Sequence, residues 1–242
     1  MSDESRQPHA ALDRDSRTCK AVKIERLLSL VTKLSGARVL EVGTGAGYIA
    51  AYLSGRVGSD GAVSAVDVID QRQLRDGFEF QLVTDTTLPF PDESFDICIS
   101  NHVLEHVGDR SAQKHHLGEI RRVLRPDGWL YLAVPNRWTL VEPHFRLPLL
   151  SWFPRSMRDR YVRWMGRGSR YDCDPPSHSE LATLLEDAGY KAREVSIEGV
   201  KVVGEIECAP GFKRWLLRHS DLWSRPLRGI LPSYLFVACR WK

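Results

Sequence analysis

The stretch that decides the fold is Val39-Leu-Glu-Val-Gly-Thr-Gly-Ala-Gly-Tyr48, in which three glycines follow a short apolar run. Glycine permits tight turns with positive φ and lets a ligand approach the main chain. A helical pattern begins at residue 48, and the free N–H groups at a helix start face a bound ligand. The stretch therefore predicts a strand, a ligand-binding loop and a helix, as in open α/β sheets.

The spacing of the glycines limits which class of ligand the loop can bind. A dinucleotide fingerprint needs Gly-x-Gly-x-x-Gly, but here the third glycine comes one residue early and Tyr48 takes its place. No Gly-Lys-Ser/Thr follows, so a P-loop is excluded. Glu41 precedes the loop, and a carboxylate there repels a pyrophosphate and favours a cationic ligand. The alternative is a plain tight turn without a ligand.

The rest of the chain alternates between apolar runs and helical patterns. Such alternation is typical of βαβ units, so we expect an α/β fold with a Rossmann-like sheet and helices on both faces. We expect a flexible tail at residues 1–15 and one domain at 16–242, with insertions at about 136–176 and 204–229. The predicted strands are 38–42, 62–66, 78–83, 96–100, 129–134, 192–197 and 235–240, and the predicted helices are 16–35, 48–56, 109–124 and 177–188.

Two further carboxylates follow predicted strands. Asp67 comes about twenty residues after the glycine loop, where an acid accepts hydrogen bonds from both ribose hydroxyls of a nucleotide. Asp85 closes the next strand and could accept a bond from an adenine amino group. Alternatively, Asp85 is an ordinary turn-forming residue without a ligand.

These motifs resemble class I S-adenosylmethionine-dependent methyltransferases, in particular the type 11, ubiquinone-pathway-like family. Four segments carry the resemblance in family order: the glycine loop, Asp67, Thr-Asp-Thr-Thr-Leu-Pro-Phe-Pro-Asp-Glu-Ser-Phe-Asp at 84–96, and Leu-Arg-Pro-Asp-Gly-Trp-Leu at 124–130. The resemblance covers roughly residues 39–135 and 177–197. It implies a seven-stranded, mostly parallel sheet whose last strand, 235–240, is antiparallel.

The resemblance also implies S-adenosylmethionine as the cofactor. Gly43, Gly45 and Asn101 would hold its methionine end, Asp67 its ribose, and Asp85 with Thr86 its adenine. The other positions of the implied cofactor site are Glu41, Thr44, Gly47 and Val68.

The segment His102-Val-Leu-Glu-His106 admits three interpretations. It matches the inverzincin pattern of zinc proteases, which the surrounding fold disfavours. It could be scaffold beneath the cofactor, with hydrogen-bonded histidines. It could also bind a divalent metal through His102, Glu105 and His106, because related methyltransferases carry a similar metal motif here. His102 in place of a glutamate favours Zn²⁺ or Mn²⁺ over Mg²⁺, and Glu142 and His144 could complete the site.

The same region offers general bases. An acceptor hydroxyl loses its proton during methyl transfer, and a histidine that titrates near neutrality can take it. The candidate catalytic residues are His106, His144 and His178.

The two insertions are basic and aromatic. Residues 136–171 contain eight arginines and two acidic residues, and five of the seven tryptophans lie within 136–225. Residues 149–164 have the pattern of an interfacial amphipathic helix, which could rest on an anionic membrane or cap an anionic substrate. The alternative is a lid with buried aromatic side chains and solvated arginines. The modest net charge of +3 does not favour a nucleic-acid partner.

Composition sets the remaining expectations. The five cysteines are scattered and form no C-x-x-C pair, and no apolar run approaches a membrane span or a signal peptide. We therefore expect a cytoplasmic protein, with peripheral contact to the inner membrane face as an option. The expected function is O-methylation of a small or lipid-linked acceptor, such as a quinone precursor or a glycan hydroxyl. The alternatives are an RNA 2′-O-methyltransferase and a non-catalytic cofactor-binding module.

Overall fold

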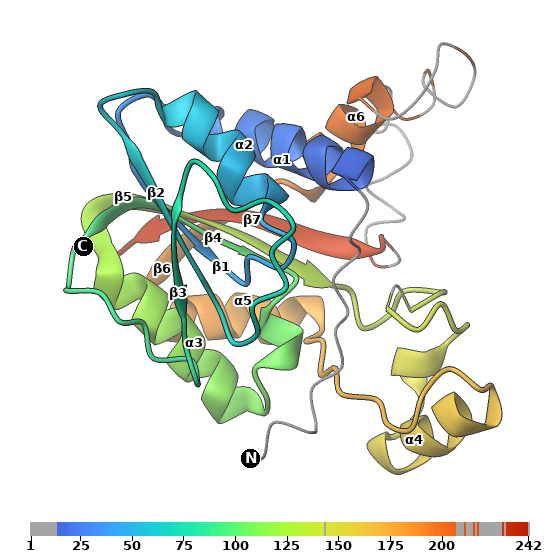
Figure 1. Ribbon diagram of the computed structural model, residues 1–242. Helices are drawn as coiled ribbons and strands as arrows, with labels where there is room; N and C mark the ends of the chain where they lie inside the picture. The colour runs from blue at the N-terminus through green and yellow to red at the C-terminus, as the bar shows by residue number, and fades with distance from the viewer. Residues whose placement is uncertain are drawn as a thin grey trace.

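The computed structural model describes residues 14–142, 144–206, 211, 215, 217, 229 and 231–241. Seven strands form one sheet in the order β3-β2-β1-β4-β5-β7-β6 (Figure 1). Every neighbouring pair is parallel except the two pairs that involve β7. The predicted seven-stranded, mostly parallel sheet is therefore confirmed. The strands are β1 (Arg38–Val42), β2 (Ala62–Asp67), β3 (Glu79–Leu82), β4 (Phe95–Asn101), β5 (Leu124–Pro135), β6 (Tyr190–Glu194) and β7 (Ser233–Arg240).

Helices cover both faces of the sheet. One face carries α1 (Arg14–Leu28), α2 (Tyr48–Val57) and α6 (Ser196–Ile206), and the other carries α3 (Arg110–Val123) and α5 (His178–Asp187) (Figure 1). Each face has its own apolar cluster, because strand side chains alternate between the two sides. The result is the three-layer arrangement of a Rossmann-like fold.

Side-chain caps start the two helices of the second face. The Asp109 carboxylate accepts a hydrogen bond from the Ala112 N–H at 3.0 Å and so caps α3. Ser177 and Glu180 form a reciprocal capping box at the start of α5. The predicted starts at residues 109 and 177 therefore agree with the structure within one residue.

Several predicted boundaries are wrong. Strand β5 begins at Leu124 rather than at residue 129, and α1 begins at Arg14, within the expected tail of residues 1–15. The first helix ends at Leu28 rather than Ser35, because the chain turns there and the Ser29 hydroxyl donates to the Arg26 carbonyl. Strand β3 ends at Leu82, so Asp85 lies three residues beyond the strand. Strand β6 ends at Glu194 rather than residue 197, because the Ser196 hydroxyl accepts the Leu235 N–H and α6 begins there. Helix α6 was not predicted.

Residues 136–174 leave the sheet after β5 and form a separate layer, which we call the lid (Figure 1). The expected amphipathic helix at 149–164 is split into η3 (Leu150–Trp152) and α4 (Arg155–Trp164). The lid has its own small apolar cluster, formed by Phe145, Leu147, Leu150, Val162, Tyr171 and Cys173.

Parts of the predicted organisation lie outside the described residues. These are residues 1–13 of the expected tail and most of the second insertion. The single-domain organisation stays a prediction. Among the described helices, none has both the length and the apolar character needed to cross a bilayer.

Candidate functional site

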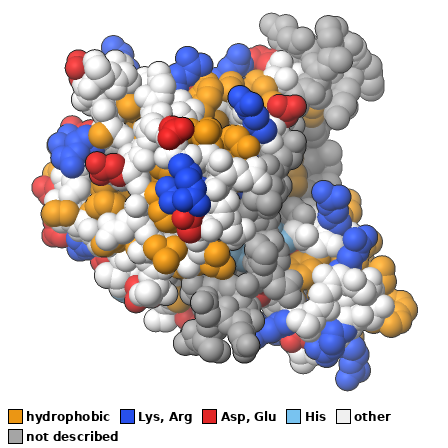
Figure 2. Space-filling view, in the orientation of Figure 1, with side chains coloured by type: hydrophobic (Ala, Val, Ile, Leu, Met, Phe, Trp, Pro, Cys, Tyr) orange, Lys and Arg blue, Asp and Glu red, His pale blue; other side chains and the backbone are white. Residues whose placement is uncertain are grey.

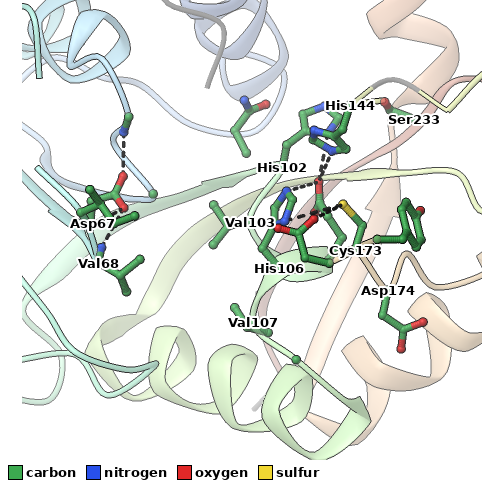
Figure 3. Close-up of a pocket in the computed structure, with 18 of the residues that line it drawn as sticks. Asp67, Val68, His102, Val103, His106, Val107, His144, Cys173, Asp174 and Ser233 are labelled. Atoms are coloured by element: carbon green, nitrogen blue, oxygen red, sulfur yellow. Dashed lines mark hydrogen bonds and ion pairs between the residues drawn. The ribbon is translucent and has the colours of Figure 1, made fainter. Parts of the chain in front are cut away.

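A cavity of about 1030 Å³ lies at the carboxyl ends of β1 and β4. These two strands are neighbours in the sheet, and their following helices cover opposite faces, so the cavity sits where open α/β sheets bind ligands. The volume is at the upper end of the range for small-molecule sites, about 300–1,000 Å³. Figure 3 shows Asp67 and Val68 at one end of the cavity and His102, His106, His144 and Cys173 at the other.

Asp67 organises the first end of the cavity. One carboxylate oxygen accepts the Gly45 N–H at 2.8 Å, and the other accepts the Val68 N–H at 2.7 Å. The last residue of β2 thereby fixes the glycine loop that follows β1. Gly43, Gly45, Val68 and Asn101, which the sequence assigned to the cofactor site, also line the cavity.

Two glycines of the loop are required for packing. Gly43 has φ of 82°, and a Cβ there would lie 2.3 Å from Cγ2 of Val103. Gly47 has φ of 85°, and a Cβ there would lie 2.2 Å from the Leu74 carbonyl oxygen. Gly47 is not a cavity-lining residue in the described structure, and neither is the buried Thr44. The Thr44 hydroxyl donates to the Val66 carbonyl at 3.3 Å, and Gly47 packs against the Leu74 carbonyl.

Glu41 lies buried at 1% exposure rather than in the cavity wall. Burial raises the pKa of Glu41 to about 8, so the neutral acid predominates at pH 7. This corrects the argument that Glu41 offers a full negative charge to a cation. Its Oε2 atom is buried and has no hydrogen-bond partner among the described residues. Arg17 of α1 lines the cavity and interacts electrostatically with Glu41. Arg17 was not among the site residues predicted from the sequence.

Asp85 and Thr86 are not among the residues that line the cavity. The Asp85 carboxylate accepts the Thr87 N–H at 2.7 Å, as a turn-forming residue does. The Thr86 hydroxyl contacts Nδ1 of His115 at 2.7 Å. Their assignment to the adenine stays a prediction.

Glu105 is the centre of the second end of the cavity. Its side chain is fully buried, and its Oε1 atom lies within 4 Å of three histidines. The distances are 3.3 Å to Nε2 of His144, 3.5 Å to Nδ1 of His102 and 3.8 Å to Nε2 of His106. His102 and His106 follow β4, whereas His144 comes from the lid, so the lid completes the cluster.

The contacts of Glu105 set the charges in this cluster. Burial alone would raise the pKa of Glu105, but hydrogen bonds from His102 and His144 lower it, so the carboxylate is ionised. Burial alone would lower the pKa of His144, but the hydrogen bond and the charge of Glu105 raise it. Burial lowers the pKa of His102, which therefore stays neutral at pH 7.

Cys173 is a cluster residue that the sequence analysis missed. Its Sγ atom lies 3.7 Å from Nδ1 of His106. Two sets of three possible metal ligands have donor atoms within 4.8 Å of one another: His106, His144 and Cys173, and His102, Glu105 and His144. The predicted trio of His102, Glu105 and His106 is not one of these sets. Both sets include His144 instead.

The structure does not bring His178 to the cavity. It is the first residue of α5, its Nε2 atom contacts the Glu194 carboxylate at 2.9 Å, and its ring packs against Tyr234. These contacts place the start of α5 against β6 and β7, which β5 separates from β4 in the sheet. Glu142 is buried in the lid, and its carboxylate accepts the Phe145 N–H at 2.6 Å.

Known proteins resemble this chain in both sequence and fold. Residues 40–132 match the family described as methyltransferase domain. The chain is 31% identical over 205 residues to malonyl-[acyl-carrier protein] O-methyltransferase of Geobacter sulfurreducens, covering 80% of this chain and 69% of that protein. The chain belongs to the S-adenosylmethionine-dependent methyltransferases.

Two further comparisons show which part of the chain is similar in sequence and how much of it is similar in fold. A ubiquinone/menaquinone biosynthesis C-methyltransferase of Xanthomonas oryzae is 36% identical over 104 residues, which are 38% of this chain and 40% of that protein. The match thus spans two fifths of that relative's length. The structure of a Burkholderia thailandensis 1,6-didemethyltoxoflavin-N1-methyltransferase with bound S-adenosylhomocysteine has the same fold. Its TM-score is 0.54 at 19% identity, covering 95% of this chain and 80% of that one.

The residues present fit the cofactor of this methyltransferase family. The Asp67 carboxylate lines the cavity beside the glycine loop, whose main chain is open to the cavity at Gly43 and Gly45. Arg17, which also lines the cavity, would supply a cation for the carboxylate of an amino acid moiety.

Proposed function

We propose that this protein transfers a methyl group from S-adenosylmethionine to an oxygen of a small or lipid-linked acceptor. The observation that supports the acceptor chemistry is the Glu105–His144 contact at 3.3 Å, beside the cofactor end of the same cavity. A carboxylate that orients a histidine is the usual arrangement for a general base. Oxygen acceptors need such a base, because a hydroxyl must lose its proton.

In this proposal, His144 takes the acceptor proton while Glu105 holds the ring. The cofactor supplies an electrophilic methyl group when it is bound. As the acceptor oxygen bonds to the methyl carbon, the carbon–sulfur bond breaks and the hydroxyl proton passes to His144. Glu105 stabilises the imidazolium that forms and fixes the orientation of the ring. His106 lies 4.9 Å from His144, ring centre to ring centre, and is the second candidate base.

Calorimetry and a product assay test the proposal. S-Adenosylhomocysteine is expected to bind and NADH is not. Methyl-labelled S-adenosylmethionine is expected to label hydroxyl acceptors, and quinone analogues rather than RNA should raise the unfolding temperature. Binding of NADH in place of the nucleoside would overturn the proposal. Protection by RNA would favour the 2′-O-methyltransferase, and binding without turnover on any acceptor would favour a non-catalytic module.

A divalent metal at the histidine cluster is the second candidate for the chemistry. The two sets of three possible ligands favour it, and the thiol of Cys173 with two histidines suits a borderline metal such as Zn²⁺. In that case the metal, and not His144, would activate the acceptor hydroxyl. Metal analysis of the purified protein, with turnover measured before and after a chelator, distinguishes the two.

We also propose peripheral contact of the lid with the inner face of an anionic membrane, where a lipid-linked acceptor would lie. Of the exposed large apolar side chains in the described chain, eight of twelve lie in residues 138–165. The described lid has three exposed arginines that do not line the cavity, Arg160, Arg163 and Arg167, and it has no exposed acidic residue. Orange and blue side chains accordingly gather over the lid in Figure 2. Aromatic and cationic side chains together are typical of an interfacial surface.

Replacing Trp164 tests this contact. Trp164 is 78% exposed at the end of α4, and Met157 and Arg160 share its helix face. We expect Trp164→Ala to lower binding to phosphatidylglycerol-rich vesicles about fivefold or more, because the indole no longer enters the interface. Co-sedimentation measures the binding to these vesicles, and uncharged phosphatidylcholine vesicles show how much of it depends on anionic lipid. Trp241→Ala is the control, since Trp241 is 61% exposed outside the lid. An absence of binding at low salt, or an equal loss in both variants, would refute the contact.

A further inference from the structure

The lid wall of the cavity carries more guanidinium groups than its own carboxylates neutralise. Arg146, Arg155, Arg158 and Arg170 all line the cavity. Asp174 pairs with Arg155 and lies 4.0 Å from Arg158, so this carboxylate serves two of the four arginines. No ion pair to Arg146 or Arg170 occurs within the described part of the chain.

The remaining lid carboxylates near these arginines are engaged elsewhere. Asp159 accepts the Tyr171 N–H at 2.9 Å. Glu142 accepts the Phe145 N–H and is buried. Asp172 accepts the hydrogen of the Cys173 thiol, with its Oδ1 atom 3.7 Å from Sγ. Arg146 and Arg170 therefore face the cavity as cations that the lid does not pair.

Arg146 and Arg170 come from segments that touch. The neighbouring rings of Phe145 and Tyr171 pack with their centres 5.4 Å apart, which brings the two segments together. Arg146 also has φ of 54°, in the left-handed region that non-glycine residues rarely adopt. Its N–H donates to the Glu142 carbonyl at 2.9 Å, which holds this backbone in place. Strained backbone of this kind is frequent where a side chain must be aimed at a ligand.

The Tyr171 hydroxyl is an independent sign of a missing ligand. Tyr171 lines the cavity, is 8% exposed, and its hydroxyl has no hydrogen-bond partner among the described residues. A tyrosine hydroxyl carries its proton at neutral pH and can therefore donate a hydrogen bond. A buried donor without a partner costs free energy, which a bound acceptor atom would recover.

We infer that Arg146, Arg170 and Tyr171 bind an anionic group of the methyl acceptor. Guanidinium groups and a hydroxyl donor together match the oxygens of a phosphate or a carboxylate. This inference rests on the proposed function, since it assigns the lid end of the cavity to the acceptor. The anion is held on the lid, beside the Glu105–His144 pair, so the acceptor is anchored there while its hydroxyl meets the base.

Calorimetry on protein saturated with S-adenosylhomocysteine tests the inference. Inorganic pyrophosphate and malonate serve as phosphate and carboxylate probes, and the tighter probe identifies the type of anion. We expect Arg146→Gln and Arg170→Gln each to weaken the tighter probe at least about tenfold, and Tyr171→Phe about threefold to tenfold. Arg160→Gln is the matched control, since Arg160 is an exposed lid arginine that does not line the cavity. It should bind the probe like the wild type.

The cofactor measurement separates this inference from the function on which it rests. All four variants are expected to bind S-adenosylhomocysteine within about twofold of the wild type, because none of the replaced residues touches the cofactor end. If the nucleoside binds but neither probe does, or if Arg160→Gln weakens the probe as much as the cavity variants, the anion site is refuted and the proposed function stands. If the nucleoside itself does not bind, the proposed function fails.

Discussion

Asp67→Ala is expected to weaken S-adenosylhomocysteine binding at least about 100-fold, because in the proposed site this carboxylate accepts charge-assisted hydrogen bonds from the two ribose hydroxyls. The same change frees the Gly45 N–H, which Asp67 accepts at 2.8 Å, so the glycine loop loses its tie to β2. Both effects act on the cofactor end of the cavity. Calorimetric titration of the nucleoside into wild type and variant measures the loss.

Asp70→Ala provides the matched control for Asp67→Ala. Asp70 lies three residues further along, pairs with Arg72 at 2.8 Å and does not line the cavity. The charge change is identical, but the affinity for the nucleoside should stay within about twofold, as is usual for sites without shared partners. Affinity of the Asp67→Ala variant within a few-fold of the wild type would show that Asp67 does not hold the ribose.

The cofactor end could be predicted because its determinants are local in sequence. The glycine loop, the strand before it and the helix after it occupy residues 38–57, and positive φ at Gly43 and Gly45 is what glycine allows. Asp67 follows from the rule that strand ends gather at one edge of a parallel sheet. Gly47 was assigned to the ligand for the same local reason, but the Leu74 carbonyl, far along the chain, determines its role.

The lid end could be predicted only in part, because it depends on contacts between distant segments. His144 and Cys173 reach the cluster from 39 and 67 residues beyond Glu105 and His106, respectively. The folding of the lid decides these contacts, and no periodicity encodes them. Helix α6 was missed because the β-branched residues Val195 and Ile197 favour a strand locally, whereas Ser196 ends β6 through its contact with β7.

The sequence contained a signal that α1 borders the cavity, namely cationic residues at helical spacing. Arg17, Lys20 and Lys23 recur at helical spacing along α1, and all three line the cavity. The apolar residues of the same helix, such as Ile24 and Leu28, are buried against the sheet. A cationic stripe beside an apolar face was therefore a sign that this helix borders a polar cavity rather than open solvent alone.

Glu105→Gln is expected to reduce kcat/KM about 100-fold or more, the range for loss of a positioned general base. The carboxylate holds His144 at 3.3 Å and, with Glu142 and Asp172, raises the pKa of His144 against the effect of burial. His144 accepts a proton only when it is neutral. In the wild type, kcat/KM should therefore fall as the pH drops through a pKa above the usual value of 6.5 for histidine.

The pH profile distinguishes a base from a structural role for this pair. In Glu105→Gln the raising influence is lost while burial remains, so the acid limb should move to lower pH. In His144→Gln the acid limb of the pH profile should disappear, and kcat/KM should fall about as much as in Glu105→Gln. An acid limb that remains in His144→Gln would assign the role of base to His106. Glu198→Gln is the control, because Glu198 pairs with Arg193 and does not line the cavity. An unshifted limb in Glu105→Gln would exclude His144 as the base. Activity that a chelator abolishes and Zn²⁺ restores would assign the cluster to a metal.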